Sequence, residues 1–148
     1  MAAAVANHLA KEALSKLPQS VRAYVSPDWE AYSAGILANV GDPIAFNAVL
    51  ALEDAGILPD PNRDYHRHTA HRLTEKEATQ YDRLVGLSRE HALALLMQFP
   101  ALASRISCFP TDIPDPFGVS AADYRICLSA ITDGVRSMLF GDSEGEQA

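Results

Sequence analysis

The most concentrated chemical signal in this sequence is the stretch 112–120, which reads Asp-Ile-Pro-Asp-Pro-Phe-Gly-Val-Ser. It sets two carboxylates, Asp112 and Asp115, three residues apart and places an aromatic ring, Phe117, two residues after the second. Carboxylates are groups that can donate or accept a proton during a reaction. Aspartates beside prolines are also common turn and cap residues, so a purely structural part for Asp112 and Asp115 stays open.

The residues around the two carboxylates predict a stiff loop between a strand and a helix. Pro116 disfavours helical backbone at Asp115 because its ring crowds the preceding residue. Gly118 permits a sharp reversal. Ser120 is placed to cap the following helix, with Asp123 as its capping-box partner. Loops that follow strands are where α/β folds hold functional side chains, so Asp115 and Phe117 should project from this one.

The rest of the chain predicts an α/β fold. Hydrophobic periodicity and capping signals alternate along the sequence, which favours a parallel sheet flanked by helices. A polar loop is expected at 58–67, an irregular stretch at 19–30, and a disordered acidic tail at 141–148, after a single domain of residues 1–140. The predicted strands are 31–36, 83–87 and 105–109. The predicted helices are 1–17, 42–56, a short one opened by the capping box Thr74–Glu77, 88–97, and a last one that ends the domain. The side chains expected to face the core are Ala92, Leu95 and Leu96 in helix 88–97, and the stripe Tyr124, Leu128, Ile131, Val135 and Met138 in the last helix.

Composition excludes several classes of protein. The net charge of −7 without a basic run argues against nucleic-acid binding and against attraction to anionic membranes. No stretch reaches membrane-spanning length, and the first residues do not resemble a secretory signal. Cys108 and Cys127 lack metal-type spacing and lie in apolar runs, so we expect buried free thiols and a cytoplasmic protein.

Several short segments, in the same order along the chain, resemble one known family. They are Ser33-Ala34-Gly35, the helix 41–56, His68-Thr69-Ala70-His71-Arg72-Leu73, Tyr81–Val85, Ser88–His91 and Asp115-Pro116-Phe117-Gly118. Together they resemble the low-molecular-weight protein-tyrosine-phosphatase family, which includes bacterial protein-arginine phosphatases. One departure is His71, which stands where the family usually has a basic residue.

The resemblance implies a three-layer fold and a role for each candidate residue. Asp115 is implied as the general acid and Phe117 as the aromatic residue at the mouth of the substrate pocket. Ser33 and His68 are implied to brace the phosphate-binding loop, and Asp112 to shape its own loop. The implied substrate is a phosphorylated protein or a small aryl phosphate, with no cofactor and no metal.

Three histidines in a short stretch, His66, His68 and His71, also allow a metal site. No acidic or cysteine ligand joins them at a metal-site spacing, so we favour solvated loop histidines.

The family's nucleophile is missing from the printed chain. Its chemistry needs a cysteine followed six residues later by an arginine, but Pro114 stands six residues after Cys108 and Asp133 six after Cys127. The family's phosphate loop, and the central strand that leads into it, precede the helix that residues 1–14 resemble. We therefore expect an N-terminally truncated, inactive phosphatase domain that lacks one central strand.

Two other functions remain open. One is a non-catalytic binding module or relic that keeps the fold. The other is an arsenate reductase, which shares this fold class but needs further redox cysteines that Cys108 and Cys127 do not supply.

Overall fold

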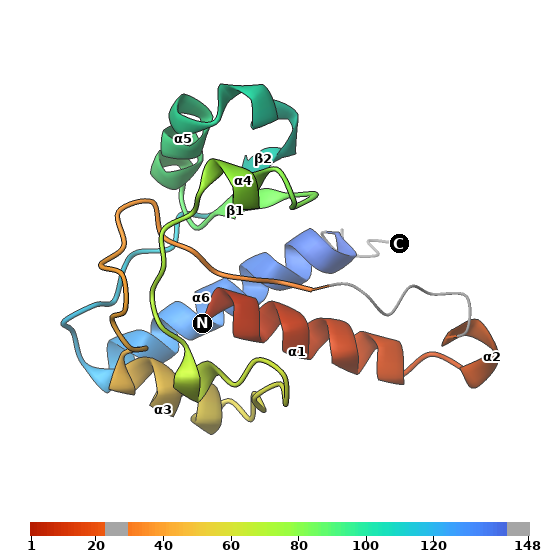
Figure 1. Ribbon diagram of the computed structural model, residues 1–148. Coiled ribbons are helices and arrows are strands. Elements are labelled where there is room, and N and C mark those ends of the chain that lie inside the picture. The colour runs from red at the N-terminus through yellow and green to blue at the C-terminus, as the bar shows by residue number, and fades with distance from the viewer. Residues whose placement is uncertain (23–29, 142–148) are drawn as a thin grey trace, which may run out of the picture.

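The computed structural model describes residues 1–22 and 30–141 and has an α/β architecture with a parallel sheet flanked by helices. Strands β1 (Leu84–Gly86) and β2 (Ile106–Cys108) pair in parallel, with Leu84 opposite Ile106. Helix α5 (Arg89–Gln98) covers one side of this pair, and α1, α3 and α6 lie on the other side (Figure 1). The predicted fold class is confirmed.

The pleat of β1 divides its side chains between two apolar clusters. Leu84 packs into a small cluster under α5 with Leu95 and Phe99, whereas Val85 packs against the larger cluster on the opposite side. Gly86 allows the close approach of α5, because a Cβ at this position would lie 2.8 Å from the backbone nitrogen of Ala92. The start of α5 is therefore fixed directly against the carboxyl end of β1.

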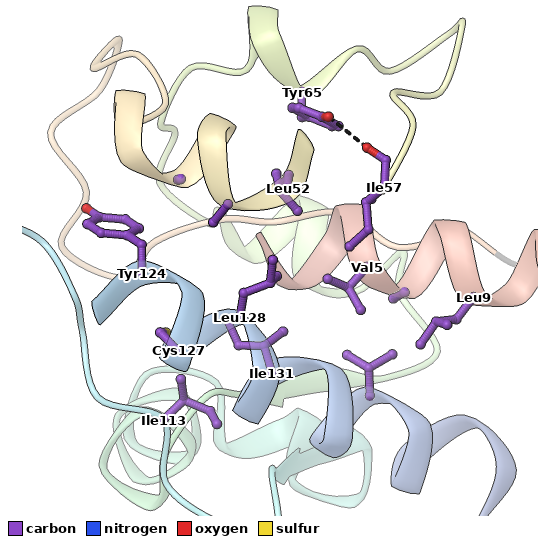
Figure 2. Packing of buried hydrophobic residues seen from close by; sticks show 14 of the residues in the cluster. Val5, Leu9, Leu52, Ile57, Tyr65, Ile113, Tyr124, Cys127, Leu128 and Ile131 are labelled. Carbon is purple, nitrogen blue, oxygen red and sulfur yellow. Dashed lines mark hydrogen bonds between the residues drawn. The ribbon is translucent and has the colours of Figure 1, made fainter. Parts of the chain in front are cut away.

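Helix α6 (Ala121–Phe140) is the centre of the larger core and contacts both α1 (Ala2–Ser15) and α3 (Phe46–Asp54). Figure 2 shows side chains from all three helices meeting in this cluster. The most deeply buried are Val5, Leu52, Ile131 and Val135. Of the predicted stripe on α6, Tyr124, Leu128, Ile131 and Val135 are buried and Met138 is half-buried.

Short helices connect these elements. They are α2 (Gln19–Arg22), the 3₁₀ turn η1 (Tyr65–Arg67), α4 (Glu75–Ala78) and the 3₁₀ segment η2 (Pro100–Arg105). The capping box predicted at Thr74 and Glu77 is present, and the Ser88 side chain caps α5. Helix α2 corrects the prediction that the irregular stretch begins at residue 19, and residues 23–29 lie outside the described residues, as does most of the predicted tail, 142–148.

The predicted strand 31–36 is wrong. Its only bridge is at Gly35, which pairs with Arg72. The backbone N–H and C=O of Ala31 instead bond to the side-chain amide of Asn7, at 2.8 and 2.9 Å. A strand needs a continuous ladder with a neighbour, and the side chain of a helix cannot extend one. Two strands therefore form in the described part of the chain, not the predicted three.

The predicted start of the second helix, at Asp42-Pro43, is also wrong. Helix α3 begins at Phe46 with Ala45 as its N-cap, which supplies no side-chain cap. The carbonyl of Asp42 accepts the N–H of Ala70 at 2.8 Å, and Pro43 forms a bridge with Thr69. These contacts hold residues 42–43 beside the segment 68–70, so the helix starts only at Phe46. Gly56, with a φ of 72°, ends it as predicted.

Two predictions of burial need correction, those for Leu96 and Cys108. Leu96 is exposed at the rim of α5, because the helix turns only Ala92 and Leu95 inward. Cys108 is a free thiol but only half-buried, since β2 has β1 as its one neighbour in the described sheet; Cys127 is buried as predicted. In α1 only the first half is buried, at Val5, Ala6 and Leu9, because the second half projects past the core (Figure 1).

Candidate functional site

The loop 112–120 folds around Asp115 through short-range hydrogen bonds. The Oδ1 atom of Asp115 accepts the backbone N–H of Phe117 at 3.0 Å. The carbonyl of Pro116 accepts the N–H of Val119 at 3.1 Å, and Gly118 has a φ of 80°, as the third residue of a tight turn requires in this geometry. The predicted reversal at Gly118 is confirmed.

Both ends of this loop are anchored to regular elements. Ile113 is buried, and its N–H donates to the carbonyl of Leu87 at the end of β1, at 2.9 Å. The Oδ1 atom of Asp112 accepts the N–H of Arg89 in the first turn of α5, also at 2.9 Å. At the other end Ser120 and Asp123 form the predicted capping box of α6. Asp112 thus connects the loop to α5, and Asp115 is placed between two fixed points.

A pocket of about 370 Å³ opens where this loop meets the amino end of α1. Asp115 and Phe117 line it together with Met1 and Ala2, so Asp115 borders the same pocket as the amino end of that helix. Most of the wall is apolar or aromatic, and Phe117 stays 78% exposed at the mouth. The lining residues are Met1, Ala2, Ala45, Ala48, Leu87, His91, Ile113, Pro114, Asp115, Pro116, Phe117, Tyr124, Cys127 and Ile131.

Burial raises the pKa of two groups that line this pocket, the Cys127 thiol and the Tyr124 hydroxyl. For Cys127, the nearby Asp115 carboxylate adds to this rise in pKa while the Met1 amino group opposes it. The Cys127 Sγ–H donates to the Pro114 carbonyl at 3.6 Å (Figure 2 shows Cys127 on α6). Burial likewise raises the pKa of the Tyr124 hydroxyl, with a further contribution from Asp115. Cys127 therefore remains a thiol at neutral pH and is a poor nucleophile.

Ser33 and His68 form a pair that is separate from the pocket lining. The Ser33 Oγ and His68 Nε2 atoms are 3.5 Å apart. Burial lowers the pKa of His68, and the positive Met1 amino group lowers it further. His68 is therefore neutral at neutral pH and lies within electrostatic reach of the start of α1. The structure brings Asp115 and Phe117 together on one pocket, whereas Ser33 and His68 are not among the residues that line it.

Sequence reasoning missed His91 as a pocket residue. It lies in the first turn of α5, directly after β1, where parallel-sheet folds gather functional side chains. Its position at the start of a helix that follows a strand was the sequence feature that could have indicated a pocket residue. Tyr124 and Cys127 were expected only as core residues of the last helix, and both also face the pocket.

The three histidines of the stretch 66–71 do not gather in one cluster of possible metal ligands. In the described residues no three acidic, histidine or cysteine side chains gather in a way that could hold a metal ion. His66 lies between two carboxylates, and His71 lies 3.5 Å from Glu77. Within the same described ranges, no helix combines the length and the apolar character needed to cross a bilayer.

The family model for low molecular weight phosphotyrosine protein phosphatase matches residues 2–146. The chain belongs to this family. It is similar in fold to the low molecular weight protein tyrosine phosphatase from T. tengcongensis, with 24% identity, a TM-score of 0.72, and coverage of 93% of this chain and 86% of the other.

Two other solved structures from the family show the same fold. A YwlE mutant from Bacillus subtilis is 20% identical, with a TM-score of 0.70, covering 91% of this chain and 86% of the other. Vibrio vulnificus Wzb in complex with benzylphosphonate is 20% identical, with a TM-score of 0.69 and the same coverage. No curated protein matches the chain by sequence.

Proposed function

We propose that the pocket beside Asp115 is the leaving-group side of a phosphatase active site in which Asp115 is the general acid. The observation that carries this proposal is the position of the Asp115 carboxylate, which lines one pocket with the first residues of α1. The amino end of a helix favours a bound phosphate, because its unpaired N–H groups and its dipole attract anions. An acid beside that position can protonate the oxygen or nitrogen that leaves phosphorus.

The proposed substrate is a phosphorylated protein residue, phosphotyrosine or phosphoarginine, or a small aryl phosphate. A thiolate attacks phosphorus as protonated Asp115 gives its proton to the leaving atom, which yields a cysteinyl phosphate and an Asp115 carboxylate. The carboxylate then takes a proton from the water that attacks this intermediate, and inorganic phosphate and the free thiolate are released. The exposed ring of Phe117 lies at the mouth, where it can stack beside an aryl group.

The thiolate itself is not supplied by the 148 residues. No cysteine in the sequence is followed six residues later by arginine, and the buried Cys127 holds its proton. We therefore propose that this chain is inactive by itself and that hydrolysis requires a strand and a Cys-x5-Arg loop that the 148 residues do not contain. Ser33 and His68 would then brace that loop. The two free cysteines fit a cytoplasmic setting.

The alternative proposal is a non-catalytic binding module. The same missing motif favours it, because the pocket and its aromatic rim are present without a nucleophile. Such a module would bind a phosphorylated or aryl ligand and release it unchanged.

One experiment separates the two proposals. The 148-residue chain and a chain extended by the in-frame upstream codons, or by the strand and Cys-x5-Arg loop of a family member, are assayed with p-nitrophenyl phosphate. We expect hydrolysis only by the extended chain. Activity of the 148-residue chain at a similar rate would contradict our account of the nucleophile, and a folded but inactive extended chain would favour the binding module.

A further inference from the structure

The imidazole of His66 is held between two carboxylates from different parts of the chain. Its Nδ1 atom lies 2.6 Å from Oδ1 of Asp64, and its Nε2 atom lies 2.8 Å from Oε1 of Glu53 on α3. A carboxylate oxygen only accepts hydrogen bonds, so both ring nitrogens must donate for both bonds to form. Both nitrogens carry a proton only in the charged imidazolium. The geometry therefore matches a protonated His66.

The ring is also positioned by its neighbours in the chain. It stacks on Tyr65 with the ring centroids 4.6 Å apart and an angle of 24° between the planes. Tyr65 is buried, and its hydroxyl donates to the Ile57 carbonyl at 2.7 Å (Figure 2). Asp64 also accepts the backbone N–H of His66 at 3.0 Å. The bond to Glu53 is thus an exposed hydrogen bond that joins this turn to α3, in addition to the buried Tyr65.

The segment after this turn is hydrogen-bonded to residues that precede the pocket wall at the start of α3. The His68 carbonyl accepts the N–H of Ile44 at 3.1 Å, and the Ala70 N–H donates to the Asp42 carbonyl. Ala45, which follows Ile44, lines the pocket. A change in how 64–68 is held against α3 can therefore reach the residues that start α3.

We propose that His66, Glu53 and Asp64 form a proton-operated clasp that fixes the segment 64–68 on α3 while the imidazole is charged and loosens it as the pH rises. The clasp joins residues 13 positions apart and involves neither Asp115 nor Phe117. It is independent of the proposed phosphatase activity.

The charges around His66 agree with this direction. The hydrogen bond to Glu53 raises the pKa of His66, and the bond to Asp64 raises it further. The same bond lowers the pKa of Asp64. The other charged or titratable groups beside them are Tyr65 and Arg67, and the positive Arg67 also favours the Asp64 carboxylate.

The sign of the pH dependence follows from these shifts. His66 has a folded pKa above its ordinary value of 6.5, so its contribution is complete below that value and is lost as the pH rises through the folded pKa. Asp64 limits the clasp on the acid side, because its lowered pKa gives a contribution that disappears as the pH falls through that pKa. The clasp is closed between these two limits.

The first test is a histidine titration by NMR on the 148-residue chain and on Glu53→Gln, which keeps the shape of the side chain and removes its charge. We expect the midpoint of His66 to fall in Glu53→Gln. The matched control is Glu12→Gln, which removes the carboxylate 4.0 Å from His8 on α1 and should leave His66 unchanged. An unchanged His66 midpoint in Glu53→Gln overturns the proposal.

The second test measures opening of the segment by the rate of trypsin cleavage after Arg67. At about pH 6, Glu53→Gln should be cleaved faster than the unchanged chain, and by about pH 9 the two rates should converge because the unchanged clasp has lost its proton. Glu12→Gln should follow the unchanged chain at every pH. The proposal is overturned if Glu53→Gln and the unchanged chain are cleaved at equal rates at about pH 6, or if the ratio of their two cleavage rates does not change with pH.

Discussion

Two connecting segments of this molecule are held in place by different forces. The loop 112–120, which carries Asp115, is fixed by backbone hydrogen bonds, by the buried Ile113 and by helix caps at both ends. The segment 58–68 has one buried anchor, Tyr65, and its other ties to distant parts of the chain include exposed charged pairs, which are Lys11 with Asp60, Arg63 with Glu30 and His66 with Glu53. The stability that comes from buried apolar contacts changes little with salt or moderate pH, whereas the stability that comes from exposed charged pairs changes with both. The contacts that hold the loop of the proposed acid should therefore respond less to salt and pH than the exposed pairs of the segment 58–68.

The largest effect should come from removing the buried anchor of the rigid loop. Ile113 is only 6% exposed, and Ile113→Ala should lower the free energy of unfolding by about 2–5 kcal/mol, from lost burial and the cavity that remains. Urea denaturation measures this change. Val119→Ala in the same loop is the control, because Val119 is 46% exposed and should change stability by less than about 0.5 kcal/mol. Equal losses of stability at the two positions would mean that the buried Ile113 does not anchor this loop more strongly than an exposed residue does.

The smallest effect should come from an exposed pair in the segment 58–68. The Lys11 ammonium lies 2.9 Å from Asp60, whose carbonyl accepts the N–H of Arg63 at 3.0 Å. In Lys11→Met we expect faster hydrogen exchange at the Arg63 amide in low salt and no difference at about 1 M salt, where exposed charges are screened. Lys16→Met, which breaks a pair within α1, is the control. A difference that persists in high salt would mean that burial, not charge, holds this segment.

The features that the sequence predicted correctly depend on contacts between residues close together in the chain. The turn at Gly118, the capping boxes at Thr74 and Ser120 and the helix end at Gly56 were all predicted, because each depends on residues within a few positions of one another. Asp115 and the first residues of α1 line one pocket although over 100 residues separate them, and no local pattern predicts that they meet.

The predictions that were wrong involve partners distant in sequence. Asp42-Pro43 has the local pattern of a helix start, but its backbone pairs with residues 68–70 and α3 starts later. The strand predicted at 31–36 depends on a neighbour that a single stretch cannot reveal, and Asn7 occupies the backbone of Ala31. The partner of His66 could not be predicted from a local pattern either, because Glu53 lies 13 residues away on a helix.

The most direct test of the central claim, that Asp115 protonates the leaving atom, compares two aryl phosphates on a chain carrying the Cys-x5-Arg loop. Phenol has a pKa of about 10 and needs a proton to leave, whereas p-nitrophenol is more acidic and needs it less. In Asp115→Asn, hydrolysis of phenyl phosphate should fall by about 10²–10⁴-fold, and hydrolysis of p-nitrophenyl phosphate should fall much less. An equal loss on both substrates, or no loss on phenyl phosphate, would contradict the assignment of Asp115 as the general acid.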